Sequence, residues 1–159
     1  MNETTQPTLI RRDALRIVGL TGDGNNTGKV WADFEAQCKA GKSSAKSVCD
    51  QMGYEVRFYN SEKNATPGRD VHVGFNALEE CAVMEGFNVL MLPASEYASF
   101  DVRVADGYDS QNAAMDKWLA DHAAEYGARL MDGVGYVVEC YNEKFKDGVV
   151  EIWVPIFRK

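Results

Sequence analysis

Two glutamates stand in segments whose other residues are apolar or aromatic. Glu139 lies two residues after Val137 and two before Tyr141, and Glu151 lies two residues before Trp153. In an alternating strand, Glu139 shares one face with Val137 and Tyr141. That face is either the solvent side of an antiparallel sheet or the wall of an aromatic pocket. In a pocket, desolvation of the carboxylate is costly unless a partner such as a cationic ligand compensates it.

The other polar motifs predict no cofactor. Residues 24–29, GNNTGK, lie between a predicted strand and a predicted helix, but one residue of the phosphate-loop spacing is missing. Val30 also follows the lysine, where a phosphate loop needs Ser or Thr. His72 and His122 have no Cys or His at the spacing of zinc ligands. We therefore expect no bound nucleotide, no metal and no other cofactor.

Charge and hydropathy exclude further classes. The chain has 159 residues, with 24 acidic against 17 basic side chains and a net charge of −7, which disfavours direct binding to nucleic acid. Its polar start resembles no secretory signal, and no apolar run is long enough to span a membrane. We expect a cytoplasmic protein with no membrane partner. The four cysteines form no Cys-x-x-Cys pair, so we expect reduced thiols: Cys38, Cys49, Cys81 and Cys140.

Hydrophobic spacing predicts a strand–helix–strand–strand order that occurs twice. The first unit has a strand at 15–20, a helix from Val30 to Cys38 bearing Trp31, and strands at 54–59 and 71–75. A second helical period covers 45–52 and ends at Gly53. The second unit has strands at 98–104, 136–141 and 149–157, and an extended segment at 88–92 precedes it. The apolar face of its helix carries Met115, Trp118, Leu119, His122 and Tyr126.

An internal duplication supports this order. Residues 53–60 match residues 135–142 at an offset of 82. Each unit alone has too little core, whereas two together can form one sheet. We predict an α+β fold of duplicated βαββ repeats with pseudo-twofold symmetry, in which a curved antiparallel sheet carries its helices on one face. Residues 1–13 are expected to form an N-terminal arm, and 14–159 a single domain with repeats at about 14–78 and 88–158.

Several segments resemble one known family. Residues 139–141, a short turn and then residues 150–156, VEIWVPI, look like the closing hairpin of GyrI-like domains. These are also the effector-binding domains of bacterial multidrug-responsive transcription regulators. Residues 93–100, PASEYASF, are similar to the family's Pro-Ala-x-x-Tyr-Ala-x-Phe segment. Trp118 fits the family's helical tryptophan, and residues 17–20 fit its opening strand.

The resemblance implies a small-molecule-binding domain with a cleft between the two repeats. The expected ligand is hydrophobic and cationic, and Glu139 matches the carboxylate that family members use for the cation. Because no helix-turn-helix segment is present, we expect a stand-alone domain without a DNA-binding part. The residues expected to contact the ligand are Glu139, Trp31, Trp118, Tyr97, Tyr141, Glu151, Trp153 and Phe58.

Two alternatives stay open beside ligand binding. Some GyrI-like proteins hydrolyse cyclopropane-bearing genotoxic compounds, and in such an enzyme Glu139 would be the general base. Other members inhibit DNA gyrase, and under this alternative gyrase or a regulator would be the protein partner. We expect binding without catalysis ahead of either.

Overall fold

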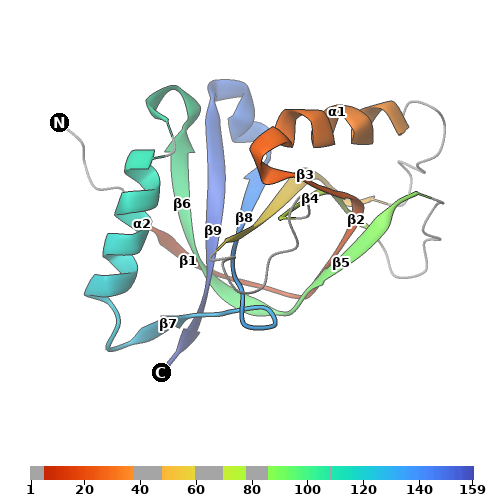
Figure 1. The fold of residues 1–159 in the computed structure, drawn as a ribbon. Coiled ribbons are helices and arrows are strands. Elements are labelled where there is room, and N and C mark those ends of the chain that lie inside the picture. The colour runs from red at the N-terminus through yellow and green to blue at the C-terminus, as the bar shows by residue number, and fades with distance from the viewer. Residues whose placement is uncertain (1–5, 38–47, 60–69, 78–85, 108) are drawn as a thin grey trace.

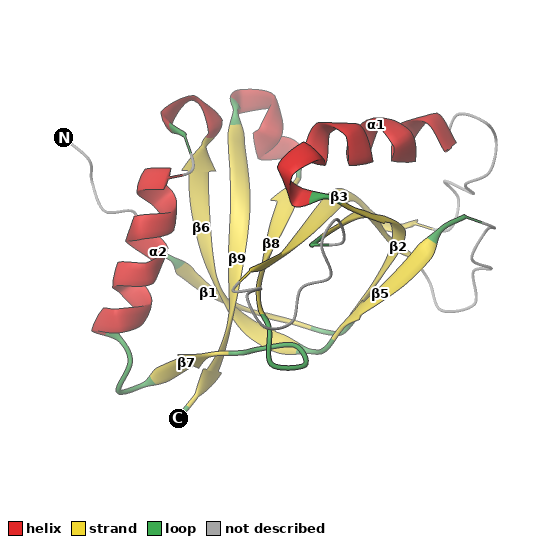
Figure 2. Ribbon diagram, in the orientation of Figure 1, coloured by secondary structure: helices red, strands yellow, loops and turns green. Residues whose placement is uncertain are grey.

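The computed structural model describes residues 6–37, 48–59, 70–77, 86–107 and 109–159. Within these ranges the chain forms nine strands, two α-helices and three short 3₁₀ helices. All strand pairs are antiparallel, and the sheet curls into a half-barrel (Figures 1 and 2). The predicted α+β class with a curved antiparallel sheet is therefore confirmed. No helix in these ranges has the length and apolar character needed to cross a membrane.

Two units with the same element order build the sheet. The first unit comprises β1 (Thr8–Arg12), β2 (Leu15–Gly22), α1 (Thr27–Gln37), β3 (Val48–Tyr59) and β4 (Val71–Ala77). The second unit comprises β5 (Asn88–Leu92), β6 (Ser95–Arg103), α2 (Asp109–Asp121), β8 (Gly135–Tyr141) and β9 (Val149–Arg158). The second unit also contains β7 (Tyr126–Ala128), which pairs with β9. The 3₁₀ helices are Gly24–Asn26, Val104–Asp106 and Glu143–Asp147.

The strand order places a pseudo-twofold axis at the centre of the sheet. The order is β1-β6-β9-β8-β3-β4-β2-β5, with β7 outside it, so each of these eight strands and its counterpart in the other unit lie equally many strands from the β8–β3 boundary. There Val56 pairs with Val138, two residues whose numbers differ by the predicted offset of 82. The axis therefore passes between these two valines, and the strands at 54–59 and 136–141 are neighbours as well as repeats.

The first strand of each unit belongs to the other half of the sheet. β1 pairs with β6 of the second unit, while β5 pairs with β2 of the first. We expected residues 1–13 to form an arm, and within them Thr8–Arg12 is a paired strand of the sheet. The two units are thus joined by their outer strands as well as by the central β3–β8 pair.

Two local predictions were wrong. Residues 45–52 were expected to be helical, but β3 already begins at Val48, and the residues before it lie outside the described ranges. The register of β3 against β4 shifts between Val48 and Gly53, and this irregularity breaks the alternation that marks a strand. Tyr126 was expected on the second helix but begins β7. Its amide donates to the carbonyl of His122, so a turn preserves the helical spacing beyond the end of α2.

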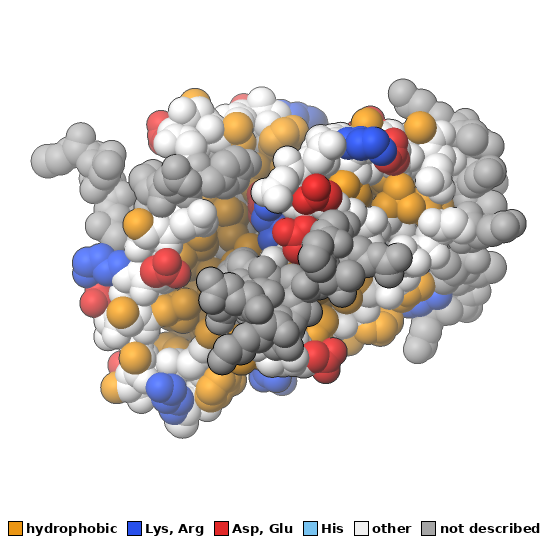
Figure 3. Space-filling view, viewed as in Figure 1, with side chains coloured by type: hydrophobic (Ala, Val, Ile, Leu, Met, Phe, Trp, Pro, Cys, Tyr) orange, Lys and Arg blue, Asp and Glu red, His pale blue; other side chains and the backbone are white. Residues whose placement is uncertain are grey.

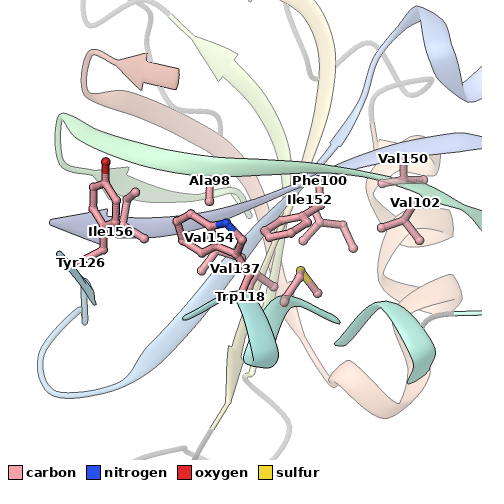
Figure 4. Packing of buried hydrophobic residues seen from close by; sticks show 11 residues of the cluster. Ala98, Phe100, Val102, Trp118, Tyr126, Val137, Val150, Ile152, Val154 and Ile156 are labelled. Carbon is pink, nitrogen blue, oxygen red and sulfur yellow. The ribbon is translucent and has the colours of Figure 1, made fainter. Parts of the chain in front are cut away.

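The two helices cover one face of the sheet. From α1, Val30 and Phe34 pack against Val71 and Val73 of β4. From α2, Trp118 packs with Met115 against apolar residues of β6, β8 and β9, which Figure 4 shows gathered between that helix and the strands. The opposite face has its own core, which includes Tyr54, Val56, Tyr97, Tyr136 and Trp153. Among the cysteines, Cys140 is buried, and the side chains of the other three lie outside the described residues.

We predict that Gly74 is required for the close approach of β2 and β4. Gly74 pairs directly with Gly19, and a Cβ on Gly74 would overlap the carbonyl of Val18. Gly74→Ala should lower the free energy of unfolding by roughly 1–3 kcal/mol or more, measured by urea denaturation. The control is Gly28→Ala in α1, where the added Cβ meets no atom of the described residues within 4 Å apart from its chain neighbours and the backbone of its own helix. It should leave stability unchanged or raise it by up to about 1 kcal/mol. Equal stabilities for the two variants would contradict the prediction.

Candidate functional site

A cavity of about 460 Å³ lies where the two units meet, on the face of the sheet that carries the helices. The first unit contributes to its lining Thr27, Gly28, Trp31, Glu55 and Arg57. The second unit contributes Asn112, Val137, Glu139, Tyr141 and Ile152. In Figure 3, hydrophobic side chains gather between α2 and α1, and acidic and basic side chains lie together beside the start of α1.

Two carboxylates face each other on the cavity wall. Glu55 of β3 pairs with Glu139 of β8 in the sheet register, and both side chains point to the helix side because β-strand side chains alternate. Glu55 is 2% exposed and Glu139 is 4% exposed. Two like charges directly opposite each other in a sheet destabilise it unless a counter-charge is present.

Arg57 supplies that counter-charge. Its Nε–H group lies 2.8 Å from Glu55 Oε2 and 2.9 Å from Glu139 Oε2 and donates to both. Its Nη2 donates to Thr27 Oγ1 at 2.7 Å, and Nη1 donates to the Gly24 carbonyl at 3.4 Å. Arg57 is thus held by β3, by β8 and by the segment that begins α1.

The aromatic part of the wall comes from Trp31 and Tyr141. Trp31 is one residue from the buried Val30 on α1, so its ring turns toward the cavity, and its Nε1–H donates to Glu55 Oε1 at 2.7 Å. The ring meets Tyr141 edge to face at 5.6 Å and lies over Gly53, where a Cβ would crowd it. The Tyr141 hydroxyl donates to Glu139 Oε1 at 3.4 Å. Indole, phenol and carboxylates therefore form one connected surface.

Burial and the neighbouring carboxylate oppose ionisation of Glu139. Desolvation is the main cause and the interaction with Glu55 adds to it, so the pKa of Glu139 rises from 4.5 to about 8 although Arg57 acts in the opposite direction. Burial also opposes the charge on Arg57, but the two carboxylates outweigh it and raise the pKa of the guanidinium above its usual value. The wall therefore holds a permanent positive charge, while Glu139 can exchange its proton near neutral pH.

Three of the eight residues expected to contact a ligand line this cavity, namely Glu139, Trp31 and Tyr141. Trp118 lies on the same face of the sheet but in the core beneath α2. There it packs edge to face on Phe100, and His122 stacks on its ring at 4.4 Å.

The remaining four lie on the opposite face of the sheet. Tyr97 and Trp153 pack together there with ring centroids 5.4 Å apart, and Phe58 packs on Tyr136 of the same cluster. The three residues lie in the core that the helices do not cover, away from the lining of the cavity.

Glu151 lies on that face near the start of β9. It accepts hydrogen bonds from Trp153 Nε1 and the Asn142 amide and forms an ion pair with Lys144 at 3.3 Å. Burial opposes its ionisation, but these donors outweigh burial and lower its pKa. Its charge is therefore already matched by local partners.

Sequence reasoning missed the most consequential part of the site, Glu55. It alternates with Tyr54 and Val56, so the pattern marks one polar face of a strand but leaves open what lies opposite. In the repeat, Arg57 is the counterpart of Glu139 at an offset of 82, and the structure brings the two into direct contact. The available signal was the repeat itself, because two repeated strands that pair antiparallel about an axis bring offset positions close together.

The geometry suits binding of a small molecule. The volume falls within the range of ordinary ligand pockets, about 300–1,000 Å³, and the walls combine aromatic rings with a few converging polar groups. Because one guanidinium compensates the two carboxylates only in part, their ionised pair makes the electrostatic potential in the cavity negative.

Comparison with known proteins identifies the family. The sequence profile of the family Cass2, described as integron-associated effector binding protein, matches residues 8–156. The chain belongs to this family. The predicted resemblance to effector-binding domains is therefore confirmed, and the matched range takes in both units, from β1 into β9.

Solved structures share the fold at low sequence identity. The structure of SAV2435 bound to tetraphenylphosphonium has a TM-score of 0.61 at 14% identity, covering 96% of this chain and 94% of that one. The EcmrR C-terminal domain has a TM-score of 0.62 at 14% identity, with coverages of 98% and 99%. The integron cassette protein VCH_CASS2 of Vibrio cholerae has a TM-score of 0.53 at 14% identity, with 96% of each chain covered. No curated protein sequence matches the chain significantly.

We predict that Glu139 makes stability fall as the pH rises. Its folded-state pKa of about 8 lies above the ordinary 4.5, so its stabilising contribution is complete below pH 4.5 and is lost as the pH rises through about 8. Urea denaturation should therefore show the wild-type protein losing stability relative to Glu139→Gln between about pH 5 and about pH 9.

The control for this measurement is Glu151→Gln. The pKa of Glu151 is lowered, so its contribution is present above the ordinary value and is lost only as the pH falls in the acid range. The stability difference between wild type and Glu151→Gln should stay constant between about pH 5 and about pH 9. Parallel curves for wild type and Glu139→Gln would show that Glu139 does not titrate differently in the folded state.

Proposed function

We propose that this effector-binding protein binds hydrophobic organic cations in the cavity between its two units. The observation that carries the proposal is the buried pair Glu55–Glu139, which shares a single guanidinium. When both carboxylates are ionised, one negative charge on the wall lacks a counter-charge among the described lining residues. A cationic ligand supplies that partner.

The walls favour delocalised cations over small inorganic ones. Trp31 and Tyr141 present ring surface and edges to the cavity, and aromatic faces attract positive charge. A large organic cation loses less hydration energy on burial than a compact ammonium ion does, so the apolar groups Val137 and Ile152 can accept it. Apolar area contributes affinity, and the carboxylate selects the sign of the charge.

A solved structure with the same fold supports the same class of ligand. SAV2435, which shares the fold of this chain, was solved bound to tetraphenylphosphonium, a hydrophobic monovalent cation. Micromolar affinity needs about −8 kcal/mol, which one aromatic pocket and one charged contact can supply. Tetraphenylphosphonium is therefore a suitable first probe.

We predict that Glu139→Gln weakens binding of tetraphenylphosphonium and leaves a neutral analogue unaffected. The substitution keeps the size and hydrogen-bonding capacity of the side chain but removes its charge. Affinity for the cation should fall by about 1.5–3 kcal/mol, the range for a charge-assisted contact. Affinity for triphenylphosphine oxide should stay within about twofold. Isothermal titration calorimetry at about pH 8.5, where wild-type Glu139 is largely ionised, measures both.

The matched control is Glu151→Gln, on the opposite face of the sheet. Because Glu151 is paired with Lys144 away from the cavity, this variant should bind tetraphenylphosphonium as tightly as wild type. Three results would each refute the proposed site: no binding by wild type, an equal loss for cation and neutral analogue in Glu139→Gln, or an equal loss in Glu151→Gln.

A further inference from the structure

The cavity wall carries an unequal number of opposite charges. Of its ten lining residues only Glu55, Glu139 and Arg57 are charged, and the groups that face them from α1, α2 and β8 are neutral: Thr27, Trp31, Asn112 and Tyr141. With both carboxylates ionised, the described lining has a net charge of −1. The charge that a ligand must bring is thus set by two acids and one base.

Hydrogen bonds hold the Arg57 side chain in a fixed position in the cavity wall. Its guanidinium is anchored by four groups from three segments, namely Glu55, Glu139, Thr27 and the Gly24 carbonyl. An arginine with one partner could swing away and leave both carboxylates to a ligand. The Arg57 side chain is 37% exposed, but it is tied at Nε and at both terminal nitrogens, so it remains in place and permanently offsets one of the two acids.

We propose that Arg57 is a specificity-determining residue that limits the site to ligands with one positive charge. This inference rests on the proposed binding of organic cations and deepens it by fixing the charge of the ligand. A monovalent cation brings the wall to neutrality, whereas a divalent cation leaves one buried positive charge without a partner. Burial of an unpaired charge is costly, so the site discriminates against the dication.

The protonation behaviour of Glu139 agrees with this balance. With the cavity empty, its pKa of about 8 keeps it protonated at neutral pH, and the lining is again neutral. A monovalent ligand therefore takes the place of one proton. The lining is neutral in both states, which is what a low-dielectric site favours.

Three probes of similar shape and different charge test the inference. These are 4-methylbiphenyl, which is neutral, N-methyl-4-phenylpyridinium, which is a monocation, and N,N′-dimethyl-4,4′-bipyridinium, which is a dication. Calorimetric titration of the wild-type protein at about pH 8.5 should rank the monocation tightest. Arg57→Gln should raise the ratio of dication affinity to monocation affinity by roughly tenfold to a hundredfold, the size of one charge-assisted contact.

Three further variants separate charge from structure. Arg57→Lys keeps the charge and should retain the wild-type ranking. Glu55→Gln keeps an acceptor for Trp31 Nε1 but removes one acid, so it should abolish the preference for the monocation over the neutral probe. The double variant Glu55→Gln/Arg57→Gln has one acid and no base, and it should recover that preference. Circular dichroism and urea denaturation establish that each variant is folded; if Arg57→Gln is not, the Glu55→Gln result decides.

The outcomes distinguish this inference from the function on which it rests. If the wild-type protein binds neither cation better than 4-methylbiphenyl, the proposed function fails and the inference fails with it. If wild type prefers the monocation but the dication-to-monocation ratio stays within twofold in Arg57→Gln, only the inference is overturned. A Glu55→Gln variant that keeps the full monocation preference overturns it as well.

Discussion

The antiparallel pairing of β3 with β8 is the contact on which the fold and the site both depend. It joins the two units across the centre of the sheet, where Val56 faces Val138. The same register places Glu55 opposite Glu139 one step further along. A slip of β3 by one residue would turn Glu55 to the other face, away from Glu139, and would move the apolar residues of β3 out of the core to which they belong. The register that completes the core therefore also assembles the charged wall.

That wall is an energetic compromise. Two carboxylates, both less than 5% exposed, lie side by side in a region shielded from water. Arg57 makes this arrangement tolerable without removing the cost, because one base cannot satisfy two acids, and the remaining imbalance appears as the raised pKa of Glu139. A site that is imperfectly compensated when empty has free energy to gain from a ligand of the right charge. A core built for stability alone would place apolar residues there instead.

The sequence permitted accurate prediction wherever the information was local or repeated. The offset of 82 identified the two matching strands, and alternation placed Glu139 on one face with Val137 and Tyr141, which all line the cavity. The sequence does not show which surface a strand meets. Trp153 alternates with Ile152 and Val154, but both faces of β9 are buried, so the pattern could not indicate that Trp153 points away from the helices. Glu55 was missed for the same reason, since its partner is set by tertiary pairing.

The pseudo-twofold axis also bears on why this site is made by one continuous chain. Positions 57 and 139 are equivalent under the repeat, yet one holds arginine and the other glutamate, and they bind each other. A symmetric dimer of two identical half-length chains would have to place the same side chain at both positions, giving either two bases or two acids. Covalent linkage of the halves removes that restriction. A symmetric framework can then enclose a cavity whose two halves carry different charges. In such a cavity a ligand has a single preferred orientation instead of two equal ones.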